Sequence, residues 1–378
     1  FVDADNGDFN LLQGSPCIDA GTTWFVYEEV DTINISNYNY EAPDMGAFES
    51  PYSEEQMVTD TISLISGWNL ISLDITMEVN SPGDVFSDLI DSDNFIAATG
   101  YDDGALFYDP TLPPFLNSFT EIIPGFGFWV KIINSDTLIA EGAEIGNNFA
   151  RDLAAGWNLL GYWRDESQPP VNGFSELIVE PQPYNLVAAT GYDNGALFYD
   201  PTLPSFLNSL TSLDNGFGYW VKTNNAADGF TYPPAGGGVA KQVVSYYETN
   251  PNIKKTNSFM FVNGSIMFDH VDYEEGERVN IFTESGLLIG DMEILEDNLL
   301  MTSPIYGDDF TTEEIDGALE GEKLIFTYNE IPSEPIDIHF TGNMELSEVA
   351  LLFKTIPMEF SLHQNYPNPF NPTTQIKY

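Results

Sequence analysis

The chain has 378 residues, with 59 Asp and Glu against 11 Lys and Arg, and its formal net charge is −48. Such a charge repels nucleic-acid phosphates and anionic lipid, both of which are bound through cationic side chains, so we expect neither as a partner. Because 43% of the residues are hydrophobic and 14% are aromatic, the chain is not a disordered acidic tail. Its length predicts two or three folded, soluble units.

No segment is apolar enough to cross a bilayer, because the longest unbroken apolar run is the five-residue stretch Val349–Phe353. The single cysteine, Cys17, excludes a disulfide framework and a cysteine-based metal site. We expect Cys17 to be a small buried apolar residue.

The N-terminal 56 residues contain two phrases in a fixed order. Gly14-Ser-Pro-Cys-Ile-Asp-Ala-Gly21 follows Gly7–Leu12, and Ala42-Pro-Asp-Met-Gly-Ala-Phe-Glu49 comes later. This order resembles the closing segment of bacterial right-handed parallel β-helix proteins, a pectate-lyase-like fold. The resemblance implies that residues 1–56 are terminal coils and a cap. Because the coils of a solenoid stabilise one another by stacking, the other coils would lie upstream of Phe1.

The middle of the chain is a tandem duplication. Residues 97–120 agree with residues 188–211 at 21 of 24 positions, at an offset of 91 residues. Gly67-Trp-Asn-Leu70 recurs at Gly156, and Gly125-Phe-Gly-Phe-Trp-Val-Lys131 recurs at Gly216 with Tyr for the second Phe. We therefore assign a first copy to residues 57–147 and a second copy to residues 148–235. These phrases are similar to modules that occur in tandem in large bacterial surface proteins.

Each copy reads as short strands separated by turns. Residues 68–73 and 128–132 are rich in aromatic and β-branched residues, which predicts strands. Asp103-Gly104 and Asn194-Gly195 predict two-residue turns, and residues 84–90 after Pro82 predict a short helix. In a domain of about 90 residues, we expect four tryptophans to fill the core of their own copy, namely Trp68, Trp129, Trp157 and Trp220.

Residues 236–356 form a third unit after the linker Pro233–Gly238. A hairpin is predicted from 259–262 to 265–268 around Asn263-Gly264, and a second one around Ser285-Gly286. Residues 336–340 alternate as a half-buried strand does, and residues 312–319 predict a helix. The pattern favours an antiparallel β-sandwich, and it resembles sandwich modules of the same bacterial surface proteins.

The C-terminal segment 357–378 carries the motif Asn365-Tyr366-Pro367-Asn368-Pro369-Phe370-Asn371-Pro372. Its prolines and asparagines predict a rigid, turn-rich entry to a strand at residues 375–378. The segment resembles the opening of the type A C-terminal sorting domain of the type IX (Por) secretion system. The resemblance implies export by that machinery, as a partner of the chain, to the outer-membrane surface or exterior of a Gram-negative bacterium. The segment matches only the start of that domain.

No constellation for catalysis or for a cofactor stands out. His270, His339 and His363 lie in separate segments, and neither a phosphate-binding loop nor a Gly-x-Ser-x-Gly elbow occurs. Asp3, Asp5 and Asp8 fail the spacing of an EF-hand loop. We therefore expect no catalytic residue, no metal site and no cofactor, with Ca²⁺ as the one ion that acidic loops could take.

The candidate ligand-binding residues lie beside the repeated turns: Tyr101, Asp102 and Asp109 in the first copy, and Tyr192, Asp193 and Asp200 in the second. Their tyrosines can stack on sugar rings and their carboxylates suit Ca²⁺, whereas the plainer interpretation is core packing for the aromatics and Asx-turns for the acids.

The sequence as a whole predicts a mainly β, multidomain string of small, independently folded units following the end of a parallel β-helix. The function that we expect is that of a non-catalytic piece of an exported surface protein, acting as stalk, spacer or ligand-binding module, with polysaccharide as a candidate ligand. Two alternatives stay open, an accessory region of a β-helix polysaccharide lyase or hydrolase, and a calcium-dependent adhesin.

Overall fold

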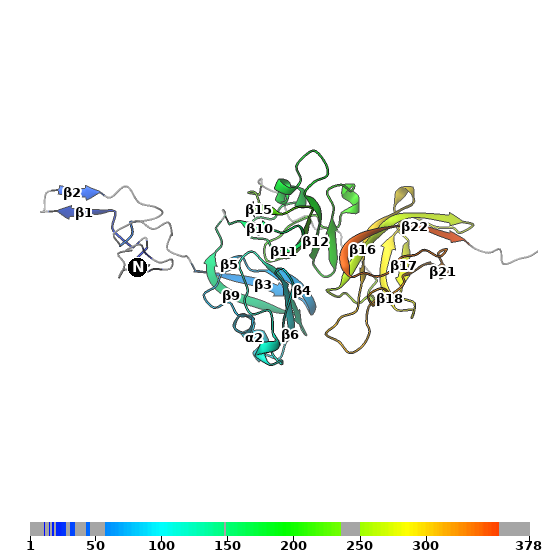
Figure 1. Ribbon diagram of the computed structural model, residues 1–378, viewed down its shortest axis with the longest axis horizontal. Coiled ribbons are helices and arrows are strands. Elements are labelled where there is room, and N and C mark those ends of the chain that lie inside the picture. Colours follow the sequence, from blue (N-terminus) through cyan, green and yellow to red (C-terminus); the bar gives the residue numbers. More distant parts are fainter. Residues whose placement is uncertain are drawn as a thin grey trace, which may run out of the picture.

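The computed structural model describes residues 57–146, 149–235 and 250–354, and shorter stretches before them (11, 15, 17–18, 20–27, 31–34 and 43–45). Within these residues the chain is mainly β and divides into several sheets, as predicted (Figure 1). Most of residues 1–56, where a β-helix end is predicted, and the whole sorting motif Asn365–Pro372 lie outside the described residues. The early stretches hold one antiparallel pair, β1 (Trp24–Tyr27) with β2 (Asp31–Asn34). Cys17 is half-buried rather than buried.

The two copies contain four-stranded sheets with the same order of strands. In the first copy the order is β4-β8-β6-β7, and in the second it is β11-β14-β12-β13. The strands are β4 (Gly67–Ser72), β6 (Phe95–Tyr101), β7 (Ala105–Tyr108), β8 (Gly127–Ile132), β11 (Gly156–Gly161), β12 (Leu186–Tyr192), β13 (Ala196–Tyr199) and β14 (Gly218–Thr223).

Smaller elements complete each copy. A second sheet in the first copy joins β3 (Met57–Leu64), β9 (Asp136–Glu144) and β5 (Ile75–Thr76), and in the second copy β10 (Arg151–Leu153) pairs with β15 (Ala227–Phe230). The predicted helix at residues 84–90 is present as two short helices. The helical turns are α1 (Pro82–Val85), α2 (Ser87–Asp91), η2 (Pro114–Leu116), α3 (Pro170–Gly173), η3 (Ser175–Leu177) and η4 (Ser205–Leu207).

The Gly-Trp-Asn-Leu phrase works as a strand start. Gly67 has a φ of 92°, a left-handed value that favours glycine. The Asn69 side chain then closes the turn, because its Oδ1 accepts from the N–H of Ile65 at 2.8 Å and its Nδ2 donates to the Ile65 carbonyl at 2.8 Å. Asn158 makes the same pair of bonds with Ala154 in the second copy. The phrase is thus a structural device for entering β4 and β11.

The two copies pack against each other through equivalent strands. Two isolated antiparallel bridges join the copies, Ile71 to Phe217 and Phe126 to Leu160. Ile71 and Leu160 occupy equivalent positions in the repeat, as do Phe126 and Phe217, so the second bridge is the first one with the two copies exchanged. At the centre, Gly127 and Gly218 approach so closely that a Cβ on Gly127 would lie 3.1 Å from the Gly218 Cα atom. The repeated glycine of the Gly-Phe-Gly phrase therefore permits an approximately two-fold contact between copies.

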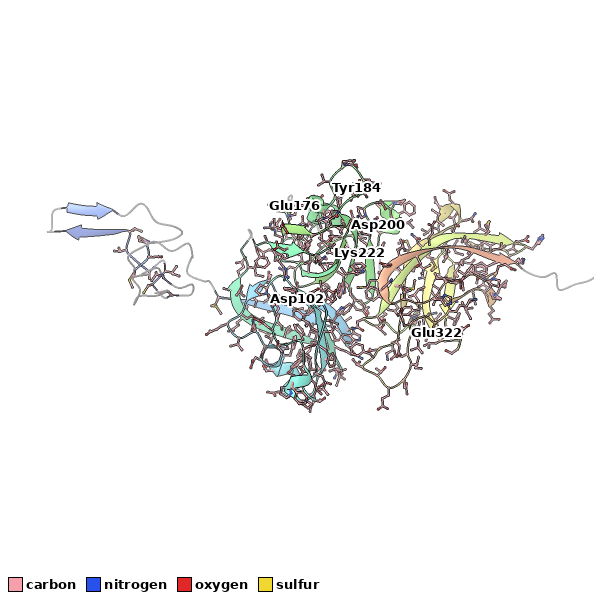
Figure 2. All side chains as sticks on the ribbon, viewed as in Figure 1. Asp102, Glu176, Tyr184, Asp200, Lys222 and Glu322 are labelled. Atoms are coloured by element: carbon pink, nitrogen blue, oxygen red, sulfur yellow. The ribbon has the colours of Figure 1, made fainter. Side chains whose placement is uncertain are left out.

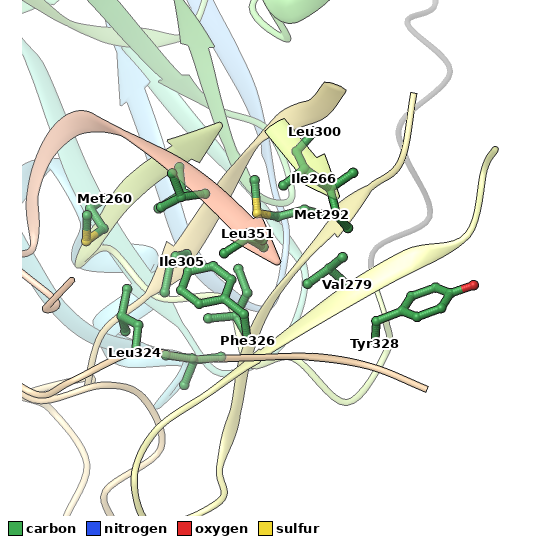
Figure 3. Packing of buried hydrophobic residues seen from close by; sticks show 14 of the residues in the cluster. Met260, Ile266, Val279, Met292, Leu300, Ile305, Leu324, Phe326, Tyr328 and Leu351 are labelled. Atoms are coloured by element: carbon green, nitrogen blue, oxygen red, sulfur yellow. The ribbon is translucent and has the colours of Figure 1, made fainter. Parts of the chain in front are cut away.

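The third unit is one curled sheet of seven strands, in the order β21-β20-β17-β18-β19-β16-β22. Its inner face carries a core of buried aliphatic and aromatic side chains from six strands, and Ile331 of the short strand β21 packs against this core (Figure 3). The elements are β16 (Phe259–Asp269), β17 (Arg278–Phe282), β18 (Leu288–Glu293), η5 (Glu296–Asn298), β19 (Leu299–Tyr306), β20 (Ile325–Tyr328), β21 (Ile331–Pro332) and β22 (Asn343–Lys354).

Several expectations for this unit are wrong. Residues 259–269 form one strand, not a hairpin, and Gly264 instead lets the parallel strand β22 approach, since a Cβ there would lie 1.9 Å from the Val349 carbonyl oxygen. The sheet is therefore not purely antiparallel. Residues 336–340 do alternate in burial as expected, with Ile336, Ile338 and Phe340 at the core, and they pair with residues 321–324 through three backbone hydrogen bonds and one antiparallel bridge. Residues 312–319 form a braced loop rather than the predicted helix. The hairpin of β17 and β18 around Gly286 is confirmed.

Candidate site at the junction of the three units

The tryptophans of the repeat do not fill the cores of their own copies, which is a correction to the sequence prediction. The core of the first copy contains none of them, and Trp68 and Trp129 belong to a cluster shared with the third unit. The cluster joins residues of all three units, among them Leu159, Tyr192, Phe198, Phe259, Phe261 and Tyr306. In Figure 1 the first copy (cyan) and second copy (green) lie together, with the third unit beside them. The three units therefore share a cluster of buried side chains where they meet.

Strand alternation explains why these strands are buried on both faces. In β8, Phe128, Val130 and Ile132 point into the core of the first copy, and Trp129 and Lys131 point to the junction. In β16, Met260 and Val262 face the core of the third unit, while Phe259 and Phe261 face the junction. A strand that reads as a continuous apolar run is covered on both sides, as in these two cases.

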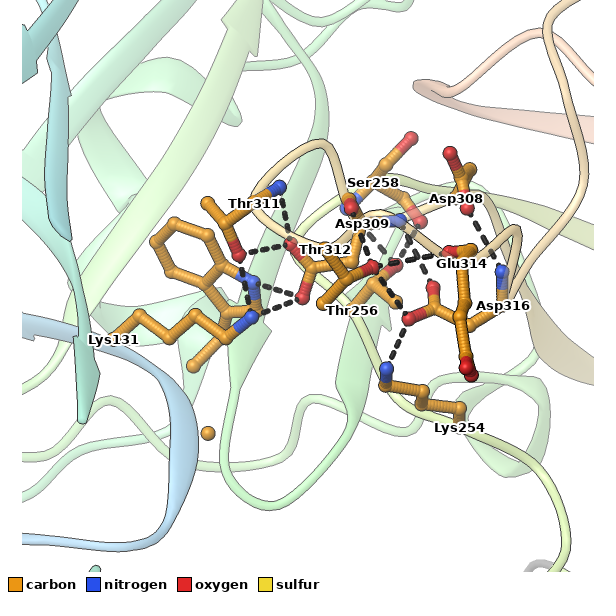
Figure 4. Close-up of polar contacts among 12 residues, drawn as sticks. Lys131, Lys254, Thr256, Ser258, Asp308, Asp309, Thr311, Thr312, Glu314 and Asp316 are labelled. Atoms are coloured by element: carbon orange, nitrogen blue, oxygen red, sulfur yellow. Dashed lines mark hydrogen bonds and ion pairs between the residues drawn. The ribbon is translucent and has the colours of Figure 1, made fainter. Parts of the chain in front are cut away.

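The first copy holds a carboxylate of the third unit with two donors. The indole Nε1 of Trp68 and the Nζ of Lys131 donate to the same oxygen of Asp309, at 2.9 and 2.7 Å (Figure 4). The Asp309 side chain is 2% exposed and that of Lys131 is 10% exposed. Burial alone would raise the pKa of Asp309, but the hydrogen bonds from Lys131 and Thr311 outweigh it and hold this pKa below its usual value.

The loop that presents Asp309 is braced before it reaches Lys131. The N–H of Asp309 donates to Asp316 at 3.1 Å, and the N–H of Asp316 donates to Asp308 at 2.9 Å. Lys254 pairs with the Asp316 carboxylate from the other side (Figure 4). Because the acceptor is already fixed, binding Lys131 costs little further ordering of the loop.

The second copy has an equivalent tryptophan and lysine, whose ion pair with the third unit is more exposed to solvent. Trp157 and Lys222 face each other in the register of β11 and β14, as Trp68 and Lys131 do in β4 and β8. In both pairs the lysine Nζ lies 5.6 Å from the tryptophan ring centroid. Lys222, labelled in Figure 2, pairs with Glu345 of β22, whose side chain is 48% exposed. Each repeated lysine therefore meets a carboxylate of the third unit.

The two candidate tyrosines pack across the boundary between copies. The Tyr101 ring lies 5.2 Å from that of Trp220 in the second copy, and the Tyr192 ring lies 4.9 Å from that of Trp129 in the first. Tyr192 is 5% exposed, and burial raises its pKa well above the usual value, so the phenol stays neutral. These aromatic faces serve the contact between the copies.

The candidate carboxylates do not gather into one site. Asp109 Oδ1 accepts from the N–H and the hydroxyl of Thr111 at 2.8 and 2.7 Å, and Asp200 binds Thr202 in the same way. Both are Asx-type turns. Asp102 is exposed beside its turn (Figure 2), and Asp193 lines a cavity described below. Within the described residues, no group of three or more His, Cys, Asp or Glu side chains is placed to hold a metal ion.

A cavity of about 820 Å³ lies where the three units meet. The turn before β4, the turn between β12 and β13, the connector 250–255 and strands β17–β19 contribute its walls. Of the six candidate ligand residues, Tyr192 and Asp193 line it. A smaller groove of about 290 Å³ between the two copies shares five lining residues with it, Ile65, Trp68, Tyr192, Asp193 and Asn194.

The charged wall of this cavity comes from residues that sequence reasoning missed. Arg278 binds the carboxylate of Asp291 through Nε and Nη2, at 2.6 and 2.8 Å, and Asp291 is itself buried. Lys255 donates to the Asn194 carbonyl at 2.6 Å, and Tyr306 accepts from the N–H of Ala196 at 2.9 Å. For the two lysine–carboxylate contacts outside the cavity a sequence signal was available, because two of only 11 cationic residues, Lys131 and Lys222, occupy the same place in two aromatic strands.

Comparisons with known proteins add no identity. No family model matches the chain, and the search of curated proteins found no match. Among the described residues, no helix is both long enough and apolar enough to pass through a membrane. His270 and His339 lie in separate exposed positions, and His363 is outside the described residues.

Proposed function

We propose that residues 57–354 act as a rigid, non-catalytic spacer of an exported bacterial surface protein. The observation that carries this proposal is the buried contact of Trp68 and Lys131 with Asp309, set in an apolar cluster to which all three units contribute. A flexible string would need no such contact, because independent units bury their apolar residues within themselves. A spacer gains from it, since a fixed geometry transmits position from one end to the other.

The repeated motif has a clear task under this proposal. Each copy presents a tryptophan and a lysine on neighbouring strands, and the following unit supplies one acidic side chain to each, Asp309 to the first and Glu345 to the second. The motif thus couples the repeat to the unit that follows it. Its acidic partners suit a chain with 59 acidic residues, in which a lysine is a scarce and selective contact.

Export through the type IX system rests on a different observation, the Pro- and Asn-rich motif at residues 365–372. The test is the location of the protein in its own cells. We expect it at the cell surface or in the medium, and retained inside the cell when the type IX machinery is inactivated. An unchanged location in such cells would refute this route.

Scanning calorimetry of the full chain tests the spacer. We expect residues 57–354 to unfold in one cooperative transition, because the shared cluster couples the stabilities of the three units. Asp309→Asn should lower the temperature of this transition or split it, and Glu345→Gln serves as the matched control at the exposed pair. Three separate transitions in the wild-type protein, unaffected by Asp309→Asn, would contradict a rigid block.

A further inference from the structure

The cavity of about 820 Å³ at the junction is of a size that holds a small organic ligand, and such sites commonly lie between domains. Its apolar walls include Ile65, Pro251 and Ile253, which can pack against the C–H faces of a ligand. Its planar polar groups include Asn194, Asn250 and Glu293, which suit hydroxyl groups. The wall therefore combines both kinds of contact.

Cations gather at this cavity in a chain that has few of them. Nine Lys and Arg residues fall within the described residues, and three of the nine, Lys254, Lys255 and Arg278, line the cavity. Two of the three are committed to carboxylates, Lys254 to Asp316 and Arg278 to Asp291. The third, Lys255, makes no ion pair with any carboxylate of the described residues.

Lys255 is held in place without a counter-charge in contact. Its ammonium donates to the backbone carbonyl of Asn194 at 2.6 Å, which leaves two of its three donors for other partners. The side chain is half-buried, and this burial lowers its pKa, although Asp291 and Asp193 act in the opposite direction. A half-buried ammonium next to an open volume is a receptor for an anionic group.

The same molecule shows how such a lysine is satisfied. Lys131, whose Nζ lies 5.6 Å from the centre of the Trp68 ring, is completed by the carboxylate of Asp309. Among the described residues of the third unit, no side chain does this for Lys255. We propose that the junction cavity binds a small polyhydroxylated carboxylate, a sugar acid, with its carboxylate on Lys255 and its hydroxyl groups on the polar wall formed by Asn194, Asn250 and Glu293. This binding goes beyond the spacer role and does not depend on it.

Calorimetric titration of the full chain tests the proposal, with glucuronic acid as the probe in about 0.15 M salt, where the repulsion from the acidic surface is screened beyond roughly 8 Å. We expect saturable binding that weakens about 10-fold or more in Lys255→Gln, because a charge-assisted hydrogen bond is lost. Lys354→Gln removes the same charge from a half-exposed lysine that lies outside the cavity and is paired with Glu334, and it should change the affinity less than about threefold.

A change to the ligand separates the contact from the folding of the variants. On the wild-type protein, the methyl ester of glucuronic acid, which has the same hydroxyl groups and no charge, should also bind about 10-fold more weakly or worse. Acetate should bind more weakly than glucuronic acid, because it lacks the hydroxyl groups. Equal binding of acid and ester, equal binding of acetate and glucuronic acid, or no saturable binding of glucuronic acid would each overturn the proposal.

Discussion

At the residue scale, the two lysine–carboxylate pairs provide a comparison within one chain. Lys131 with Asp309 is almost fully buried, whereas Lys222 with Glu345 is partly exposed. Breaking a buried pair by removing one partner is costly, because the remaining charge stays buried, whereas an exposed pair contributes little. The two copies thus place the same motif in two dielectric environments.

Asp309→Ala should therefore lower the free energy of unfolding by about 3 kcal/mol, and Glu345→Ala by no more than about 1 kcal/mol. Urea denaturation of the full chain, followed by tryptophan fluorescence, measures both. Equal losses in the two variants would show that the junction does not bury the Lys131 pair.

Asp60 and Asp74 form a second residue-scale feature, at the boundary between the copies. Burial and the nearby carboxylate of Asp74 raise the pKa of Asp60 to about 6. Asp74 in turn accepts a hydrogen bond from Asn215 of the second copy at 2.6 Å. The folded state therefore binds a proton that the unfolded state releases at a lower pH.

This shift makes stability depend on pH with a definite sign. Because the folded-state pKa of Asp60 lies above the unfolded value, its contribution is full below about pH 4 and is lost as the pH rises through about 6. We expect Asp60→Asn to remove this loss, so that the variant gains melting temperature relative to wild type as the pH rises from 4 to 7. Asp91→Asn, at the exposed end of α2, is the control. Parallel curves for wild type and Asp60→Asn would disprove the assignment.

At the element scale, local sequence predicted most strands and turns. Strands β4 and β8 lie where aromatic and β-branched residues cluster, and the Asp103-Gly104 turn has the expected positive φ values. The failures have a common cause. Asn263-Gly264 carries a turn signal, but its glycine serves a close approach of β22, a strand about 80 residues later in the chain. Local pattern cannot distinguish these two uses of glycine.

The glycines between the copies lead to a prediction about strand packing. A Cβ on Gly127 would lie 2.7 Å from the Leu160 carbonyl oxygen, so one backbone must move. Gly127→Ala should therefore destabilise the protein by about 3 kcal/mol, at the upper end of the usual cost of overpacking.

Gly100→Ala is the matched control for this change. It also lies in a strand, β6, but its Cβ would meet only the Phe119 ring and Leu106 at ordinary distances of 3.5 Å or more. We expect a loss of less than about 1 kcal/mol there. Thermal denaturation of both variants gives the comparison, and a mild effect of Gly127→Ala would contradict the close contact between the copies.

At the scale of the whole molecule, the repeat could be predicted from the sequence but the packing of the units could not. The duplication is visible in the residues themselves, and each copy has the same sheet order. The position of Trp68 depends on Asp309, which is 241 residues away, and the wall of the cavity likewise combines segments of all three units. Such contacts leave no local pattern, so the sequence alone cannot show that the tryptophans lie between the units and outside the cores of their own copies.

The shared cluster also changes what the candidate ligand residues can do. The rings of Tyr101 and Tyr192 pack against tryptophans of the other copy and are not available to stack on a ligand. The candidate ligand-binding site is therefore the cavity beside Lys255. A rigid junction would keep that cavity in one shape. Rigidity of the three units is therefore the central claim of this account.

The distance distribution between two spin labels, measured by pulsed electron spin resonance, tests that rigidity most directly. With Cys17, the single cysteine, replaced by Ser, labels at Glu176→Cys in the second copy and Glu296→Cys in the third unit occupy exposed positions. We predict one narrow distance distribution, which broadens in Asp309→Ala. A broad distribution in the protein with Asp309 intact would contradict the account and restore the picture of separate units on a flexible string.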